Sequence, residues 1–265
     1  MIKNKLFFII KLEIKENIKN KWLLLYGIIF TIFIFLLSKI GVSNIYRTNM
    51  MSINLILLLL PLTSLIFSFI SISESINFQE YLISLPVKRS VIFIGKLIGI
   101  SSSLSFSFVV GVFLGSVIQN NNYMYNFNNY MVLLTTGLEL IFIFNALSFL
   151  VVTVFKKKEI ALLIVILLWF ILFIVYDIMI INLIIIFNQY PIEKLILLIT
   201  AINPIDLARL TMLFKMDVSA IMSCSFMVYE KFLRDQGSFV CSVLLFIWII
   251  LISRLGVLFF EKKDF

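Results

Sequence analysis

Two carboxylic acids stand inside long apolar stretches of the sequence, and they have the clearest potential for chemistry. Glu139 lies deep within one stretch, and Asp177 lies toward one end of the next. Because an acid in hydrocarbon is costly, such residues indicate a polar cavity, a proton relay or a cation site. The alternative is a structural carboxylate that is protonated or paired with Ser, Asn or Lys, and we favour it for both residues.

Other chemistry finds no support in the sequence. There is no histidine, which removes the commonest general base and metal ligand and excludes a Ser-His-Asp hydrolase. The pair Gly95-Lys96 has Ser90 and Leu97 where a phosphate loop needs Gly and Ser or Thr. Two isolated cysteines make no zinc pattern. We expect no catalytic residue, no metal site and no cofactor in this chain, so any ATP-Mg must bind to a partner.

The composition sets the environment in which these acids lie. Of 265 residues, 62% are hydrophobic and 14% charged, and the mean hydropathy is +1.12. A soluble domain is about half apolar and a quarter charged, so the bilayer must be the solvent here. The net charge of +8 comes from basic residues that flank apolar segments, which indicates membrane topology rather than nucleic-acid binding. We predict an all-α integral membrane protein with a single transmembrane domain over residues 1–265.

Six apolar segments have the length that a membrane crossing needs. They are predicted at residues 22–40, 51–73, 97–118, 130–155, 160–187 and 238–260. Pro61 is expected to kink the second span, and Gly95-x-x-x-Gly99 and Gly111-x-x-x-Gly115 would permit close helix approach in and before the third. The apolar piece at 195–202 is too short to cross.

Residues 1–21 alternate apolar side chains with lysines. Lys11, Lys15 and Lys19 recur at helical spacing, which predicts an amphipathic helix on the cytosolic face with its lysines toward anionic headgroups. A basic topology anchor without a partner is the alternative. The short loops assigned to the cytosol hold most of the basic residues, so both termini are predicted to be cytosolic and the protein to lie in the cytoplasmic membrane.

A polar segment, residues 74–96, separates the second and third predicted spans. Within it we predict a short amphipathic helix, a proline stop and a basic pair, formed by Glu80, Tyr81, Leu82, Leu85, Pro86, Val87, Lys88 and Arg89. An apolar knob with flanking charges fits a groove on a soluble partner. The alternative is a solvated loop, which would expose its apolar residues to water.

Methionines other than Met1 all fall in the outer half of this topology: Met50, Met51, Met124, Met131, Met179, Met212, Met216, Met222 and Met227. Thioethers suit Cu(I), and Met212 and Met216 would share a helix face. No Met-x-x-Met cluster is present, so flexible packing filler is the favoured interpretation.

The run LISLPVKRSVIFIGKLIG, residues 82–99, resembles the cytosolic loop of ABC-2 type permeases. Further segments resemble the NosY-type permeases within that family. These are KLEIKENIKNKWLLLY at 11–26, NLILLLLPL at 54–62, Leu168-Trp169 with Tyr176-Asp177, and Asn203-Pro204-Ile205-Asp206 with Arg209.

The resemblance implies six spans in each protomer of a homodimer and two copies of a separate, NosF-like ABC ATPase. Residues Glu80–Arg89 would sit in the ATPase groove. Asn203, Pro204, Asp206 and Arg209 would form an outer re-entrant region that meets the second protomer or a periplasmic NosD-like protein. The NosY likeness implies a role in assembling the copper centres of nitrous oxide reductase.

Three other functions stay open at this point. One is an ABC-2 exporter of a lipid, drug or peptide. A second is a mechanical coupler that moves an outer partner without passing a solute. The third is an intramembrane enzyme that uses Glu139 or Asp177, which lacks any supporting motif.

Overall fold

The computed structural model describes residues 2–40, 45–75, 87–118, 127–155, 157–187, 193–215 and 236–262, and these ranges hold helices and no strand. The predicted all-α membrane architecture is confirmed. In chain order the helices are α1 (Ile2–Lys19), α2 (Lys21–Ile40), α3 (Ile45–Glu74), α5 (Arg89–Ile118), α6 (Phe127–Val154), α7 (Lys158–Phe170), the π-helical turn η2 (Ile171–Val175), α8 (Tyr176–Ile186), α9 (Glu193–Ile202), α10 (Pro204–Lys215) and α12 (Gly237–Lys262).

Within the described residues, five helical segments are long and apolar enough to cross a membrane: α3, α5, α6, the continuous run α7–η2–α8, and α12. Two bent pairs could raise the number to seven, with α1 and α2 meeting at 69° and α9 and α10 at 109°. Each predicted span falls on one of these helices. The count of six crossings lies inside this range and stays a prediction.

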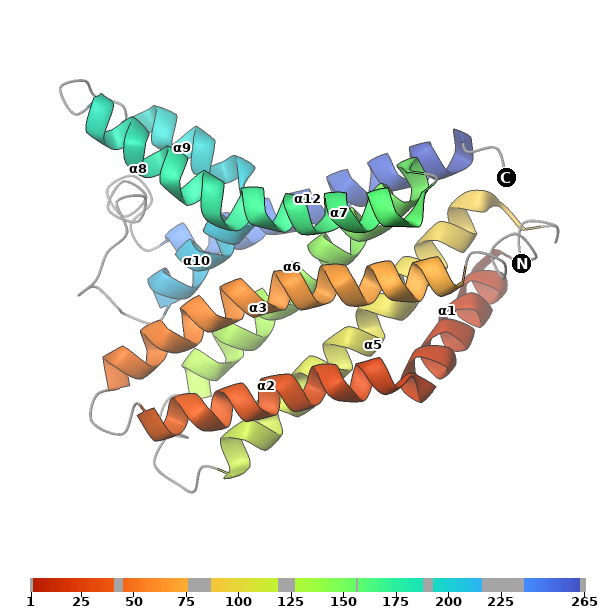
Figure 1. The fold of residues 1–265 in the computed structure, drawn as a ribbon, viewed down its shortest axis with the longest axis horizontal. Helices are drawn as coiled ribbons and strands as arrows, with labels where there is room; N and C mark the ends of the chain where they lie inside the picture. The colour runs from red at the N-terminus through yellow and green to blue at the C-terminus, as the bar shows by residue number, and fades with distance from the viewer. Residues whose placement is uncertain are drawn as a thin grey trace.

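The long helices lie side by side along the molecule (Figure 1). The start of α1, the end of α3, the start of α5 and the end of α12 gather at one end. At the other end α8 and α9 extend away from the bundle (Figure 1). The two ends of the bundle therefore differ in shape, and we describe them below as the α1 end and the α8 end.

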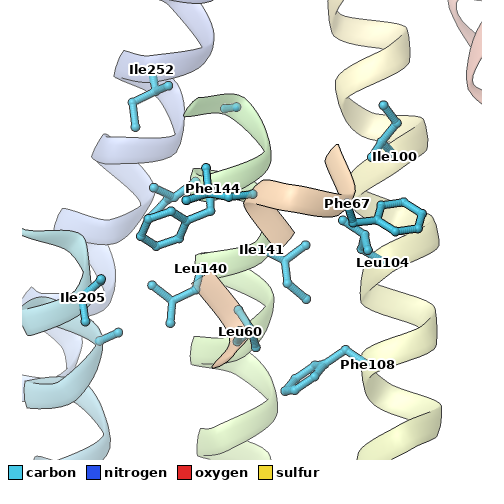
Figure 2. Close-up of a cluster of buried hydrophobic side chains, with 14 of the residues drawn as sticks. Leu60, Phe67, Ile100, Leu104, Phe108, Leu140, Ile141, Phe144, Ile205 and Ile252 are labelled. Carbon is cyan, nitrogen blue, oxygen red and sulfur yellow. The ribbon is translucent and has the colours of Figure 1, made fainter. Parts of the chain in front are cut away.

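Helix α6 forms the centre of the core, because 67% of an 18-residue apolar stretch of this helix is buried inside the fold. Its side chains Leu140, Ile141 and Phe144 meet buried residues from α3, α5, α10 and α12 (Figure 2). In a bilayer the lipid tails are as apolar as leucine, so association of these helices rests on close van der Waals packing.

Glycines on one side of α5 set how closely α1 and α2 approach it. A Cβ atom at Gly99 would lie 2.5 Å from the Cβ of Glu13, and one at Gly95 would meet Ile9 at 2.8 Å. A Cβ atom added at Gly111 or at Gly115 would lie 2.6 or 2.8 Å, respectively, from the nearest atom of α2. The glycine spacing of four therefore lies at a real helix contact, and α5 carries α1 on one half and α2 on the other.

The start of α5 differs from the predicted limit of the third span. The helix begins at Arg89 rather than at residue 97. The second half of the polar segment is therefore helical, because Val91, Ile92 and Phe93 are buried and continue the apolar face toward the α1 end. The predicted span starts at residue 97 because Lys96 is the last charged residue before the apolar run. In the fold, the charge of Lys96 is compensated by Glu13, so the helix can begin earlier.

Candidate functional site

The predicted partner-binding segment lies largely outside the described residues, which leave out Glu80, Tyr81, Leu82, Leu85 and Pro86. Its last three residues are described. Val87 is half-buried, Lys88 is exposed, and the Arg89 guanidinium donates a 2.9 Å hydrogen bond to the carbonyl of Glu261 at the end of α12. The segment thus joins α5 where α5 and α12 meet. Its contact with an ATPase stays a prediction.

A buried ion pair joins α1 to α5 beside this segment. The Nζ of Lys96 lies 3.1 Å from a carboxylate oxygen of Glu13, and the two side chains are 0% and 4% exposed. The same ammonium donates a 2.6 Å hydrogen bond to the hydroxyl of Ser75, directly after α3. We call Glu13, Ser75 and Lys96 the inner cluster. It connects three segments that surround residues 76–86.

A second polar contact fixes α1 one turn further along. The hydroxyl of Ser71 in α3 donates a 3.0 Å hydrogen bond to the side-chain oxygen of Asn17. Ile9, Glu13 and Asn17 are buried and recur every four residues, so they form the inner face of α1. Lys11, Lys15 and Lys19 are exposed on the opposite side, as an amphipathic helix requires.

The inner cluster was not predicted from the sequence. There, Lys96 is a topology signal and Glu13 has no assigned role. A usable signal was present, because Glu13 and Asn17 share the helix face opposite the exposed lysines. A polar pair on the apolar face of an amphipathic helix indicates a partner inside the protein.

A second charge cluster lies toward the α8 end. The guanidinium of Arg209 donates two 2.9 Å hydrogen bonds to the two carboxylate oxygens of Asp177. Its Nη1 also donates to Asp206 at 3.1 Å. Asn203 donates a 3.1 Å bond from its side-chain nitrogen to Asp206. We call these four residues the outer cluster. It unites Asp177 with the motif Asn203–Arg209, two features that lie far apart in the sequence.

Asn203 and Pro204 create the bend that brings α10 to this place. The side-chain oxygen of Asn203 accepts a 3.0 Å hydrogen bond from the backbone N–H of Ile205, which caps the start of α10. Pro204 occupies the first helical position, where no N–H is needed. The resulting 109° turn between α9 and α10 points Asp206 and Arg209 toward α8.

The π-helical turn η2 receives a hydrogen bond from this bend. The Asn203 side-chain nitrogen donates at 2.8 Å to the carbonyl of Leu172, inside the turn. Just after the turn, the hydroxyl of Tyr176 donates to the carbonyl of Ile199 in α9. On the other side, Trp248 of α12 donates a 3.0 Å bond from its indole nitrogen to the carbonyl of Ala201. The bend is therefore held by polar contacts on both sides.

Glu139 is half-buried within α6 and takes part in an interaction inside the fold. Among the residues that the structure describes, no three His, Cys, Asp or Glu side chains lie close enough together to hold a metal ion. Met212 is fully buried in the core, and Met216 lies in the last range left undescribed before α12. The roles predicted for Glu139 and for the methionines stay predictions.

The long apolar helices define a multi-pass α-helical membrane protein. The chain matches the family model of the ABC-2 family transporter protein over residues 7–265. Since that match covers nearly all of the chain, the protein belongs to the ABC-2 transporter family. A search of the curated proteins gives no match.

Proposed function

We propose that the chain is the membrane-spanning permease subunit of an ABC transporter, and that a separate ATPase docks on Glu80–Arg89. The inner cluster carries this proposal. Ser75 and Lys96 lie on either side of the docking segment in sequence and are in contact in space, and Glu13 adds α1 to the same contact.

The inner cluster gives the docking segment a firm base. Both charged side chains are buried, so separating them would leave an uncompensated charge inside the protein. A displacement of the segment by an ATPase would therefore move α1, α3 and α5 together. Because Arg89 is bonded to Glu261, α12 would follow.

We further propose that the transporter is of the NosY type and serves copper-centre assembly of nitrous oxide reductase. In this proposal it is a homodimer in the cytoplasmic membrane with cytosolic termini, a NosF-like ATPase and a NosD-like periplasmic partner. Support comes from the outer cluster, since Asp177, Asn203, Asp206 and Arg209 belong to the segments that resemble NosY-type permeases and are in mutual contact.

Copurification tests the first proposal. A tagged chain in native membranes is expected to retain an ABC ATPase, and Glu80→Lys or Leu82→Asp is expected to release it. Lys157→Glu is the matched control, because it changes an exposed charge at the start of α7 without touching the segment. Full ATPase retention by both segment variants would refute the docking site.

The specific role is tested by deleting the gene in a host that makes nitrous oxide reductase. We expect the enzyme to accumulate without its copper centres, which removes their visible absorption. A reductase with normal copper content would refute the NosY-type assignment. Export of a lipid, drug or peptide would then be the function to measure in vesicles.

A further inference from the structure

Helix α8 is joined to the bundle by few contacts other than its own continuation from α7. Its apolar side chains Ile181 and Ile185 are 53% and 67% exposed, and Leu198 on the neighbouring α9 is 71% exposed. Figure 1 shows both helices extending beyond the bundle. Helix α10 is different, because Ile205, Leu207 and Ala208 are fully buried. Helix α8 thus exposes much of its apolar surface to the outside of the fold, whereas α10 is packed within it.

The Asp177–Arg209 ion pair is a polar contact between α8 and α10. Both Asp177 oxygens accept from the guanidinium, a geometry that gives strong and oriented pairing. The Asp177 side chain is 33% exposed and that of Arg209 is 20% exposed. Both side chains therefore lie partly at the surface of the fold and not wholly within its packed core.

Arg209 has a second acid on its own helix. Asp206 lies one turn earlier in α10, 3.1 Å from the guanidinium, and its side chain is only 4% exposed. Asn203 donates to the other oxygen of Asp206 and holds that carboxylate in place. If Asp177 leaves, the guanidinium keeps a buried, oriented counter-ion. The cost of leaving the guanidinium unpaired is therefore avoided.

We propose that Asp177 and Arg209 form a reversible latch between α8 and α10, and that Asp206 retains Arg209 when the latch is open. The turn η2 is the pivot. It lies directly before Tyr176 and Asp177 and interrupts the α-helical hydrogen-bond pattern, as such turns do at functional sites. Asn203 holds the carbonyl of Leu172, in the first half of the pivot. Opening therefore moves α8 while α7 and α10 stay in place.

The latch deepens the proposed function by naming the outer contact that opens in the permease. It rests on that function only for its place in a transport cycle. The test uses the full chain in lipid nanodiscs without an ATPase. Failure of the latch is therefore measured separately from failure of ATPase docking.

Hydrogen–deuterium exchange of α8, α10 and α6 measures the latch. Asp177→Asn is expected to speed exchange in α8 by about tenfold, the equivalent of one charge-assisted contact at a partly exposed site. Exchange in α10 is expected to stay within about twofold of the unchanged protein, because Asp206 still holds Arg209. The variant Asp177→Asn/Asp206→Asn is expected to speed exchange in α10 as well.

Two results would overturn the latch. One is unchanged α8 exchange in Asp177→Asn. The other is exchange in α10 that rises as much in Asp177→Asn as in the double variant. Asp206 would then not retain Arg209 when the latch is open. Asn182→Ala is the matched control, because this exposed α8 residue bonds only to the carbonyl of Ile178 in its own helix. Asp177→Glu keeps a carboxylate and is expected to restore most of the protection, whereas a structural role sensitive to side-chain size would not be rescued.

Discussion

The ammonium group of Lys96 lies 3.1 Å from a carboxylate oxygen of Glu13, and neither side chain is more than 4% exposed. The first helix of the chain is therefore tied to α5 by charge as well as by packing. Lys96 also donates to Ser75, so the cluster has hydrogen bonds in addition to the ion pair. Removing one member of such a cluster is costly, whereas removing both charges together is not.

Lys96→Met is accordingly expected to destabilise the protein by about 3–5 kcal/mol, because it leaves the Glu13 carboxylate buried without a cation. The double variant Glu13→Leu/Lys96→Met is expected to recover most of that loss. Thermal unfolding of the purified chain in detergent measures both. Lys158→Met, at an exposed lysine of α7, serves as control. A double variant no more stable than Lys96→Met would contradict this account of the pair.

The contact between α1 and α5 can also be tested by adding a side chain at Gly99. Alanine there would place its Cβ 2.5 Å from the Cβ of Glu13, which sits close to the backbone of α1 and cannot rotate away. We expect Gly99→Ala to push α1 outward and to raise hydrogen exchange along α1 by about tenfold. Val110→Leu adds volume on the exposed side of α5 and is expected to change little. Equal protection of α1 in both variants would rule out a close α1–α5 approach.

Asn203 can be tested by separating its donor from its acceptor. Its oxygen caps Ile205, while its nitrogen donates to Leu172 and Asp206. Asn203→Asp keeps the cap but turns a carboxylate toward another carboxylate. We therefore expect Asn203→Asp to lower the melting temperature more than Asn203→Ala, which itself costs about 1–3 kcal/mol for unsatisfied groups. Asn54→Ala, at an exposed position in α3, is the control, and the reverse order would show that the cap dominates.

Trp169 links the long α7–η2–α8 segment to α3. Its indole nitrogen donates a 3.2 Å bond to the carbonyl of Leu58, and its ring stacks on Phe173 at 5.7 Å between centroids. Trp169→Phe is expected to keep the stacking and lose the bond, at a cost of about 0.5–1.5 kcal/mol in thermal unfolding. Trp22→Phe, at a 49% exposed tryptophan, is expected to be neutral. A larger loss at Trp22 would contradict the assignment.

Most helices of the fold could be predicted from apolar length, because a chain in hydrocarbon must satisfy its backbone hydrogen bonds within each segment. The π-helical turn could not. Its sequence Ile171–Val175 is apolar like its neighbours and has no Pro or Gly. What distinguishes the turn from its neighbours is a tertiary contact, the hydrogen bond from the Asn203 side-chain amide to the Leu172 carbonyl.

The members of the outer cluster could be picked out singly, but their meeting could not. Asp177 attracted attention as an acid in an apolar stretch, and Arg209 as part of a polar motif. They are 32 residues apart, and they meet only because the chain turns by 109° at Asn203. The pair Asn-Pro marks such a turn without giving its direction. Contact across a turn is thus a property of packing rather than of local pattern.

The inner face of α1 also fixes the order in which the molecule can assemble. Glu13 is synthesised well before Lys96, and its partner residue and the glycines that accommodate α1 all belong to α5. Until α5 has been made, the Glu13 carboxylate lacks its cation. The first helix made is therefore seated only after α2, α3 and α5 have been made. Its docking marks the assembly of the amino-terminal half of the protein.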